Sequence, residues 1–124
     1  MLTFPTNVRL FLAHHPIDFR KSFNGLAAYV ESNFHMQTMN GDIFIFLNRR
    51  GTQVKILFWD RDGFCLIAKR LEQGTFHRVR QASNDAAQVE LTAGELVMLL
   101  EGIDARDIRH KKRFSRQKNT EVSA

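Results

Sequence analysis

The feature that most constrains the fold is the segment 42–70, in which three β-prone runs are separated only by short polar turns. The runs are DIFIFLN at 42–48, TQVKILFW at 52–59 and FCLIAKR at 64–70. Connections as short as RRG and DRDG usually join antiparallel neighbours. We therefore expect two successive antiparallel hairpins.

The closing residues of each turn predict a pairing register, because opposite residues in a hairpin are counted outward from the turn. In the second hairpin we expect Asp60 opposite Gly63, which pairs Phe58 with Cys65, Ile56 with Ile67 and Val54 with Lys69. In the first hairpin we expect Asn48 opposite Gly51, which pairs Ile45 with Val54 and Ile43 with Ile56.

Alternation along these strands divides their side chains between two faces, and both faces are apolar. A sheet with one wet face alternates cleanly between apolar and polar residues, so we expect each face to be covered. A first helix can cover one face, and a C-terminal helix or another subunit can cover the other. One face carries Ile43, Ile45, Leu47, Val54, Ile56, Phe58, Cys65 and Ile67, and the other carries Phe44, Phe46, Lys55, Leu57, Trp59, Phe64, Leu66, Ala68 and Arg70.

The flanking segments predict further elements. VRLFLA, at Val8–Ala13, is typical of a short strand, and apolar residues at helical spacing predict a helix over 19–32 with Asp18 as its N-cap. Weaker strands are expected at 75–80 and 87–92.

A second helix is expected after Thr92, because Glu95 three residues later completes a capping box. Its apolar stripe consists of Leu96, Leu99, Leu100 and Ile103, and Gly102 is a candidate stop signal.

These patterns predict an α+β fold, in which a small, mostly antiparallel sheet of about five to six strands packs with two helices. The 124 residues favour one domain, at 1–104, followed by a basic tail at 105–124 that we expect to be disordered from about residue 108. No apolar run reaches the roughly 20 residues of a membrane helix. The first residues lack the pattern of a signal peptide, and a single cysteine excludes an internal disulfide. We expect a cytoplasmic protein without membrane association.

The net charge of +5 is concentrated near the C-terminus. Residues 1–103 hold 11 Lys+Arg and 10 Asp+Glu, a net of +1, whereas residues 104–124 hold 7 and 3, a net of +4. A basic tail on a nearly neutral body favours a polyanionic partner, most simply nucleic acid. The alternative is a solubilising terminus.

Catalytic and metal chemistry find little support in the sequence. Alternation places Cys65 among apolar residues, which predicts a buried structural thiol rather than a nucleophile. The five histidines show no metal-binding spacing. The carboxylates of Asp18, Asp42 and Asp60 also lack a spacing that indicates a nuclease, and the turn-favouring pattern of DRDG explains Asp60 and Asp62. We expect no enzyme activity, no metal and no cofactor.

Basic residues give the stronger signal, since residues 49–80 hold eight Lys and Arg against three acids. Basic side chains beside aromatic ones on a sheet can bind a nucleic-acid strand by phosphate contact and base stacking. Alternatively, the aromatic residues form core and the basic groups extend around its rim. The candidate nucleic-acid-binding residues are Arg20, Lys21, Arg49, Arg50, Lys55, Lys69, Arg70, Arg78, Arg80, Lys111, Lys112 and Arg113.

Three stretches carry a resemblance to a known family. DFRKSFNGLA (18–27), the long block FIFLNRRGTQVKILFWDRDGFCLIAKRLEQGTF (44–76) and LLEGID (99–104) resemble the small TnpB-like accessory protein of the insertion sequence 66 family of bacterial transposable elements. Ser22 and Asn24 depart from the more usual Gly and Asp of that family. The resemblance implies a role in transposition beside a larger transposase that carries the catalytic acids, and it supplies no catalytic residues for this chain.

Together, the charge pattern and the resemblance predict a non-catalytic accessory protein that binds element DNA or a DNA–transposase complex. The alternative is a protein-interaction module or self-assembling subunit, a homo-oligomer included, without direct DNA contact. A hidden nuclease is a third hypothesis, which would require metal-dependent cleavage.

Overall fold

The structure is a computed structural model that describes residues 8–76, 86–101, 103–104 and 107–110. In chain order, its elements are β1 (Leu10–Ala13), α1 (Phe23–Tyr29), the π-helical turn η1 (Val30–Phe34), β2 (Ile43–Leu47), β3 (Gln53–Asp60), β4 (Gly63–Arg70), β5 (Gln88–Leu91), α2 (Ala93–Glu101), β6 (Ile103–Asp104) and β7 (Asp107–His110).

Five strands form one sheet in the order β4-β3-β2-β1-β5. All neighbours are antiparallel except β1 and β2, which are parallel because the chain crosses over through α1 between them. Strands β6 and β7 form a separate two-stranded sheet. The predicted α+β class, with a mostly antiparallel sheet and two helices, is confirmed.

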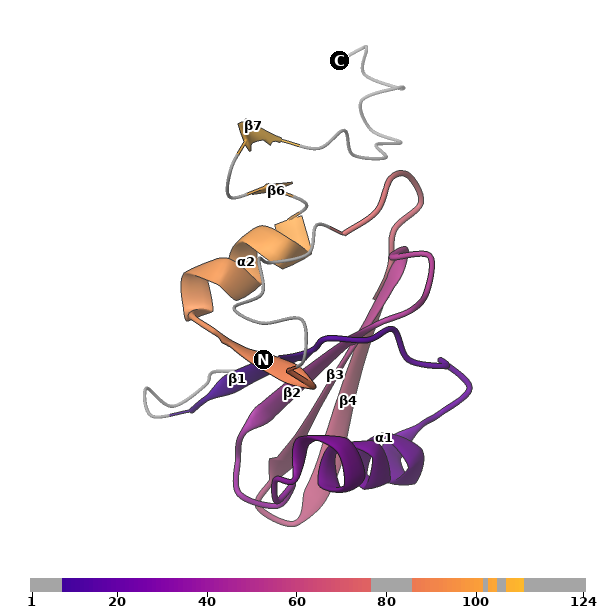
Figure 1. Cartoon of the computed structure of the whole chain (residues 1–124), viewed down its shortest axis with the longest axis vertical. Helices are drawn as coiled ribbons and strands as arrows, with labels where there is room; N and C mark the ends of the chain where they lie inside the picture. Colours follow the sequence, from indigo (N-terminus) through magenta and orange to yellow (C-terminus); the bar gives the residue numbers. More distant parts are fainter. Residues whose placement is uncertain (1–7, 77–85, 102, 105–106, 111–124) are drawn as a thin grey trace.

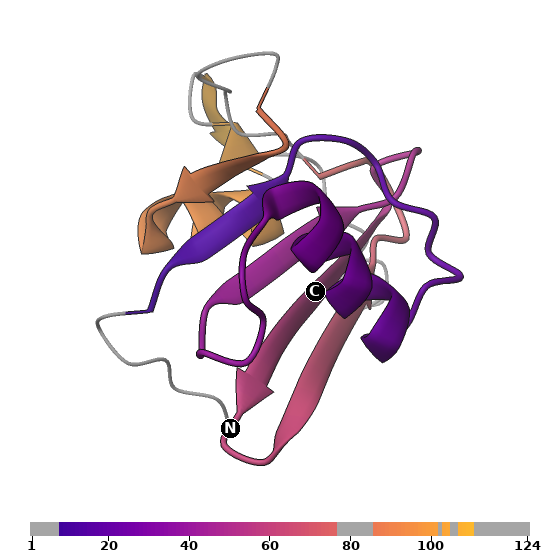
Figure 2. The ribbon, with the colours of Figure 1, turned by 60° about the horizontal axis from the view of Figure 1, so that its bottom comes forward.

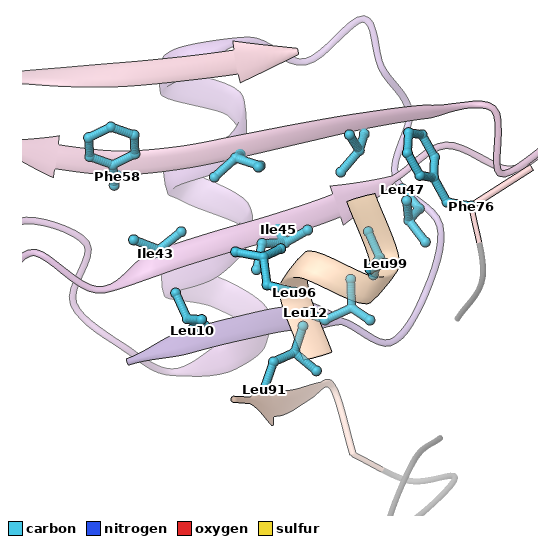
Figure 3. Close-up of a cluster of buried hydrophobic side chains, with 12 residues drawn as sticks. Leu10, Leu12, Ile43, Ile45, Leu47, Phe58, Phe76, Leu91, Leu96 and Leu99 are labelled. Carbon is cyan, nitrogen blue, oxygen red and sulfur yellow. The ribbon is translucent and has the colours of Figure 1, made fainter. Parts of the chain in front are cut away.

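The two helices lie on opposite sides of the sheet (Figures 1 and 2). On one side, Leu26 and Val30 pack with Phe44 and Phe46 in a core that also includes Phe34. On the other side, α2 covers the aliphatic cluster drawn in Figure 3, whose buried members are Leu10, Leu12, Ile43, Ile45, Leu47, Val54, Ile56, Phe58, Phe76, Leu91, Leu96 and Leu99. The predicted division of side chains between two covered faces is therefore confirmed.

The β3–β4 register agrees with the prediction, with Asp60 opposite Gly63 and Phe58 opposite Cys65. The predicted β2–β3 register is wrong by two residues, because Ile45 faces Ile56 and not Val54. A shift of two leaves every side chain on its predicted face.

The side chain of Asn48 explains the longer β2–β3 turn. Its Oδ1 accepts hydrogen bonds from the backbone N–H groups of Thr52 (2.9 Å) and Gln53 (3.0 Å). Gly51 has the left-handed φ of 74° that this turn requires. The turn thus closes at Leu47 and Val54, and Asn48 lies inside it.

The first helix begins later than predicted, and Asp18 is not its N-cap. Ser22 precedes the first helical residue, Phe23, and makes no side-chain capping bond. Asp18 instead accepts a hydrogen bond from the backbone N–H of Arg20 (3.0 Å), in a separate turn ahead of the helix. The helical stretch ends at Phe34, before the left-handed His35.

The capping box of the second helix is confirmed by reciprocal bonds between Thr92 and Glu95. The N–H of Glu95 donates to Thr92 Oγ1 at 3.1 Å, and the N–H of Thr92 donates to Glu95 Oε1 at 2.9 Å. The predicted strand at 87–92 corresponds to β5, whereas residues 77–80 of the strand predicted at 75–80 lie outside the described residues.

The end of the chain is described only in part. Strand β7 reaches His110, so regular pairing continues beyond the expected start of disorder near residue 108. Residues 111–124 lie outside the described residues, and the disordered tail and the domain boundary at 104 stay predictions.

Candidate nucleic-acid interface

The sheet topology gathers basic side chains at one end of the molecule. Strands β1, β2 and β4 all finish at this end, and β3 begins there. The turns and strand ends at this place, which we call the basic end, hold six basic residues and two acidic ones in the described chain. The basic residues are Arg20, Lys21, Arg49, Arg50, Lys69 and Arg70, and the acidic ones are Asp18 and Glu72.

The opposite end of the sheet has the reverse balance. Arg9 and Arg61 lie there beside Asp42, Asp60 and Asp62, at the start of β2 and in the β3–β4 turn. Arg9 is bound to Asp42 (2.7 Å), and Arg61 lies 3.9 Å from Asp60. The charge of the described chain is thus polarised along the strand direction.

Arg49 and Arg50 form the most prominent part of the basic end. Both are exposed at the tip of the β2–β3 turn and have no ion-pair partner among the described residues. They line a pocket of about 440 Å³ together with Pro16, Ile17, Asp18, Phe19 and Asn48. Sequence reasoning identified the two arginines but missed the opposing segment 16–19, since no local pattern indicates that Ile17 N–H donates to Leu47 O (3.0 Å).

The turn that carries these arginines is held from two sides. Within the turn, Gly51 N–H donates to Asn48 O at 3.1 Å, and Phe76 N–H donates to Gly51 O at 2.7 Å. Because Phe76 is itself buried in the aliphatic core, the backbone of the turn is fixed to the body of the protein.

Arg20 lies beside the pocket and is bound to Asp18. Its guanidinium donates to both carboxylate oxygens, the shortest distance being 2.7 Å. These hydrogen bonds lower the pKa of Asp18 to about 2. The Arg20 side chain is 90% exposed, so the pair costs little to open in water.

Lys55 has an internal role. Its ammonium donates to the carbonyl oxygens of Phe19 and Lys21, both at 2.9 Å, and lies 5.0 Å from the centroid of the Phe19 ring. It therefore fixes the segment before α1 onto β3. Sequence reasoning placed Lys55 on the correct face but assigned its charge to a ligand.

The aromatic residues on the Lys55 face are mostly core. Phe44 and Phe46 are fully buried beneath α1 and η1, so they are not available for stacking with bases. Trp59 and Phe64, in edge-to-face contact at 5.0 Å, are only half-buried. For Phe44 and Phe46, the interpretation as core is the correct one.

Lys69 and Arg70 differ in their surroundings. The Lys69 ammonium donates to the carbonyl of Leu100 (3.3 Å) near the end of α2, where a positive charge is favourable. Arg70 pairs with Glu72 at 3.3 Å, and its side chain remains 69% exposed. The remaining candidates, Arg78, Arg80, Lys111, Lys112 and Arg113, lie outside the described residues.

Cys65 is only half-buried, which corrects the predicted burial, because β4 lies at the edge of the sheet. Its side chain still packs against the aliphatic core. Within the described chain, no group of three His, Cys, Asp or Glu side chains is arranged to hold a metal ion. No helix there is long and apolar enough to cross a membrane.

Comparison with known proteins gives a consistent result. The family model described as IS66 Orf2 like protein matches residues 8–110. The uncharacterized protein y4hO of Sinorhizobium fredii is 33% identical over 106 residues, which cover 86% of this chain and 90% of the relative. The uncharacterized protein y4jC of the same organism is 33% identical over 104 residues, which cover 84% and 86%. No solved structure gives a significant match.

Proposed function

The chain belongs to the IS66 Orf2-like family of transposition-associated accessory proteins, and from this premise we propose that it binds DNA through its basic end. The proposal includes no catalytic step. The chain would act beside a larger transposase that performs the chemistry, by holding element DNA or a DNA–transposase complex.

The polarised charge is the observation that carries this proposal. Six basic residues meet Asp18 and Glu72 in the turns and strand ends of the basic end, with Glu101 at the adjoining end of α2, and the opposite end of the sheet has a slight excess of acids. Arg49, Arg50 and Lys21 are exposed and have no ion-pair partner among the described residues, so they can contact phosphates without breaking an internal bond. Phosphate contacts by such side chains supply most of the sequence-independent affinity for DNA.

One segment outside the described residues, 77–85, follows directly in the chain from the basic end. Phe76, whose N–H donates to Gly51 O, lies two residues before Arg78 and four before Arg80. The C-terminal part of α2 is attached there through Lys69. We propose that Lys111, Lys112 and Arg113 add further phosphate contacts.

Alanine substitution of the two turn arginines tests the proposal. The Arg49→Ala/Arg50→Ala double variant is expected to weaken binding to duplex DNA by about tenfold or more at low salt. Arg61→Ala is the matched control, because Arg61 is an equally exposed arginine in a turn at the opposite end. Equal affinities of the two variants, or no DNA binding by the parent chain, would contradict the proposal.

An acidic surface of the transposase is the alternative partner for the basic end. A pull-down from cells that carry the whole element, with and without nuclease treatment, separates the two. Loss of the transposase after nuclease treatment supports a DNA contact. Retention that depends on Arg49 and Arg50 supports a direct protein contact instead.

A further inference from the structure

Strand β4 forms an edge of the five-stranded sheet and has an unusual composition for an edge. Its residues 63–68, GFCLIA, carry no charge, and all but the last are half-buried rather than exposed. Edge strands of stable monomers commonly carry a charge or a proline in the middle, which prevents pairing with another strand. In β4 the charged residues are Lys69 and Arg70, both at its C-terminal end.

The backbone geometry shows which groups of β4 point outward. Leu71 N–H donates to Thr52 O at 2.8 Å, in the same register that pairs Asp60 with Gly63. Alternate residues of an antiparallel strand bond to the same neighbour, so Gly63, Cys65, Ile67 and Lys69 bond to β3. The N–H and C=O groups of the residues between them point away from β3, and no strand of the described chain pairs with them. These residues are Phe64, Leu66, Ala68 and Arg70.

Apolar side chains border this open edge on both faces of the sheet. Cys65 and Ile67 extend the aliphatic core from the α2 side, and Phe64 and Leu66 extend the aromatic core from the α1 side. All four are half-buried, so an added strand would complete the cover of both cores at once.

We propose that the occupant of this edge is a second copy of the same chain, paired antiparallel along β4 with Leu66 opposite Leu66. In this register Phe64 faces Ala68 of the partner, and Arg70 lies next to Asp62 of the partner. Two-fold symmetry repeats each contact. The two sheets join into one continuous sheet with an ion pair at each end of the junction.

Charge disfavours one of the two neighbouring registers. If one β4 strand is shifted along the other, the outward N–H and C=O groups of the two copies face each other again only after a shift of two residues. One such shift places Asp62 beside Glu72 of the partner, which is repulsive. In that register Arg70 lies opposite Phe64 and has lost its ion-pair partner. The other shift places the carboxylate of Asp62 opposite Ala68 and brings Arg70 level with Asp60 at the β3–β4 turn, so charge does not exclude it. In the single chain, Asp62 has no ion-pair partner among the described residues, and Arg70 has only the exposed contact with Glu72.

Light scattering on the full chain, coupled to size-exclusion chromatography without DNA, tests the pairing. A concentration-dependent dimer is expected. Ala68→Pro should weaken dimerisation by about tenfold or more, because each copy loses an N–H donor to the partner. The monomer tolerates this proline because the N–H of Ala68 points away from β3. Ala68→Thr, which keeps the donor, is the matched control, and circular dichroism verifies folding of both.

The ion pairs provide a second test, specific to the register. Asp62→Arg alone should weaken the dimer, because it places two arginines together, and adding Arg70→Glu should restore it. A chain that stays monomeric at every concentration, a dimer that survives Ala68→Pro, or a double variant that is no better than Asp62→Arg would overturn the proposal. Since no DNA is present, these outcomes do not depend on the DNA-binding proposal.

Discussion

At the scale of single residues, Lys55 shows how a charge can be used inside the fold. Its ammonium donates to two backbone carbonyls at 2.9 Å and connects β3 to the segment before α1. Lys55→Met is expected to reduce the free energy of unfolding by about 2 kcal/mol, since both carbonyls lose a charged donor. Urea denaturation measures this loss. Lys21→Met is the control, because the exposed Lys21 ammonium makes no such bonds, and an equal loss in both variants would contradict the assignment.

Asp18 provides a titration test at the same scale. Hydrogen bonds from Arg20 lower the pKa of Asp18 to about 2. The pair therefore stabilises the fold above the ordinary carboxyl pKa of about 3.9, and its contribution is lost as the pH falls through about 2. NMR titration of the Asp18 carboxyl should give a midpoint near 2 in the parent chain, and a higher midpoint in Arg20→Gln.

Arg61→Gln is the control for this titration, because Arg61 lies at the opposite end of the sheet, and it should leave the midpoint of Asp18 unchanged. A parent chain in which Asp18 titrates in the ordinary carboxyl range would show that the pair with Arg20 does not persist in solution.

At the scale of elements, the β2–β3 turn connects stability with binding. Asn48 Oδ1 accepts two backbone hydrogen bonds that shape the turn carrying Arg49 and Arg50. Asn48→Ala should reduce the free energy of unfolding by about 1–2 kcal/mol and also weaken DNA binding. Asn48→Asp, which retains the acceptor oxygen, should keep most of the stability. DNA binding that is unchanged in a destabilised Asn48→Ala variant would separate the turn from the interface.

The basic tail is a second element whose part in binding can be tested. Because β7 extends to His110, a chain that ends there keeps the β6–β7 pair and loses Lys111, Lys112 and Arg113 together with Arg116 and Lys118. We expect its binding to duplex DNA to be about tenfold weaker, by the same factor for different DNA sequences. Replacing Lys111, Lys112 and Arg113 by Gln in the full chain should reproduce most of this loss. Full affinity without the tail would restrict the DNA contact to the preceding residues.

Local patterns predicted much of this architecture, and the exceptions have physical reasons. The register predicted from the two-residue β3–β4 turn is correct. The β2–β3 turn is longer than predicted, because the side-chain oxygen of Asn48 accepts the backbone hydrogen bonds of Thr52 and Gln53. Helix α1 starts late because Asp18 forms a turn with Arg20. The parallel β1–β2 pair is a long-range contact that no local pattern indicates.

The candidate site was predictable only as a set of charges. Clustering of Arg and Lys in the sequence indicated Arg49 and Arg50, which are exposed in the structure, and their contact with DNA stays a prediction. Clustering could not separate them from Lys55, because the carbonyl groups that bind Lys55 belong to residues 34 and 36 positions away. The segment 16–19, which faces the arginines across the pocket, is placed by a backbone bond to the end of β2.

At the scale of the whole molecule, the two proposed surfaces run in different directions and meet at Arg70, which belongs to both. The basic end lies at one end of the strands, and the β4 edge runs along one side of the sheet. Antiparallel pairing along β4 would direct the basic ends of two copies in opposite directions. A dimer of this kind would present two separate DNA-binding ends, so loss of dimerisation should leave the affinity of a single basic end for a short duplex unchanged.

The salt dependence of DNA binding is the most direct test of phosphate contacts at the basic end. Fluorescence anisotropy with a short duplex, measured over a series of salt concentrations, gives the slope of log K against log salt. We predict a steep negative slope for the parent chain, a slope shallower by about two for Arg49→Ala/Arg50→Ala, and the parent slope for Arg61→Ala. A slope that the double variant leaves unchanged, or an affinity insensitive to salt, would contradict a DNA-binding role for the basic end.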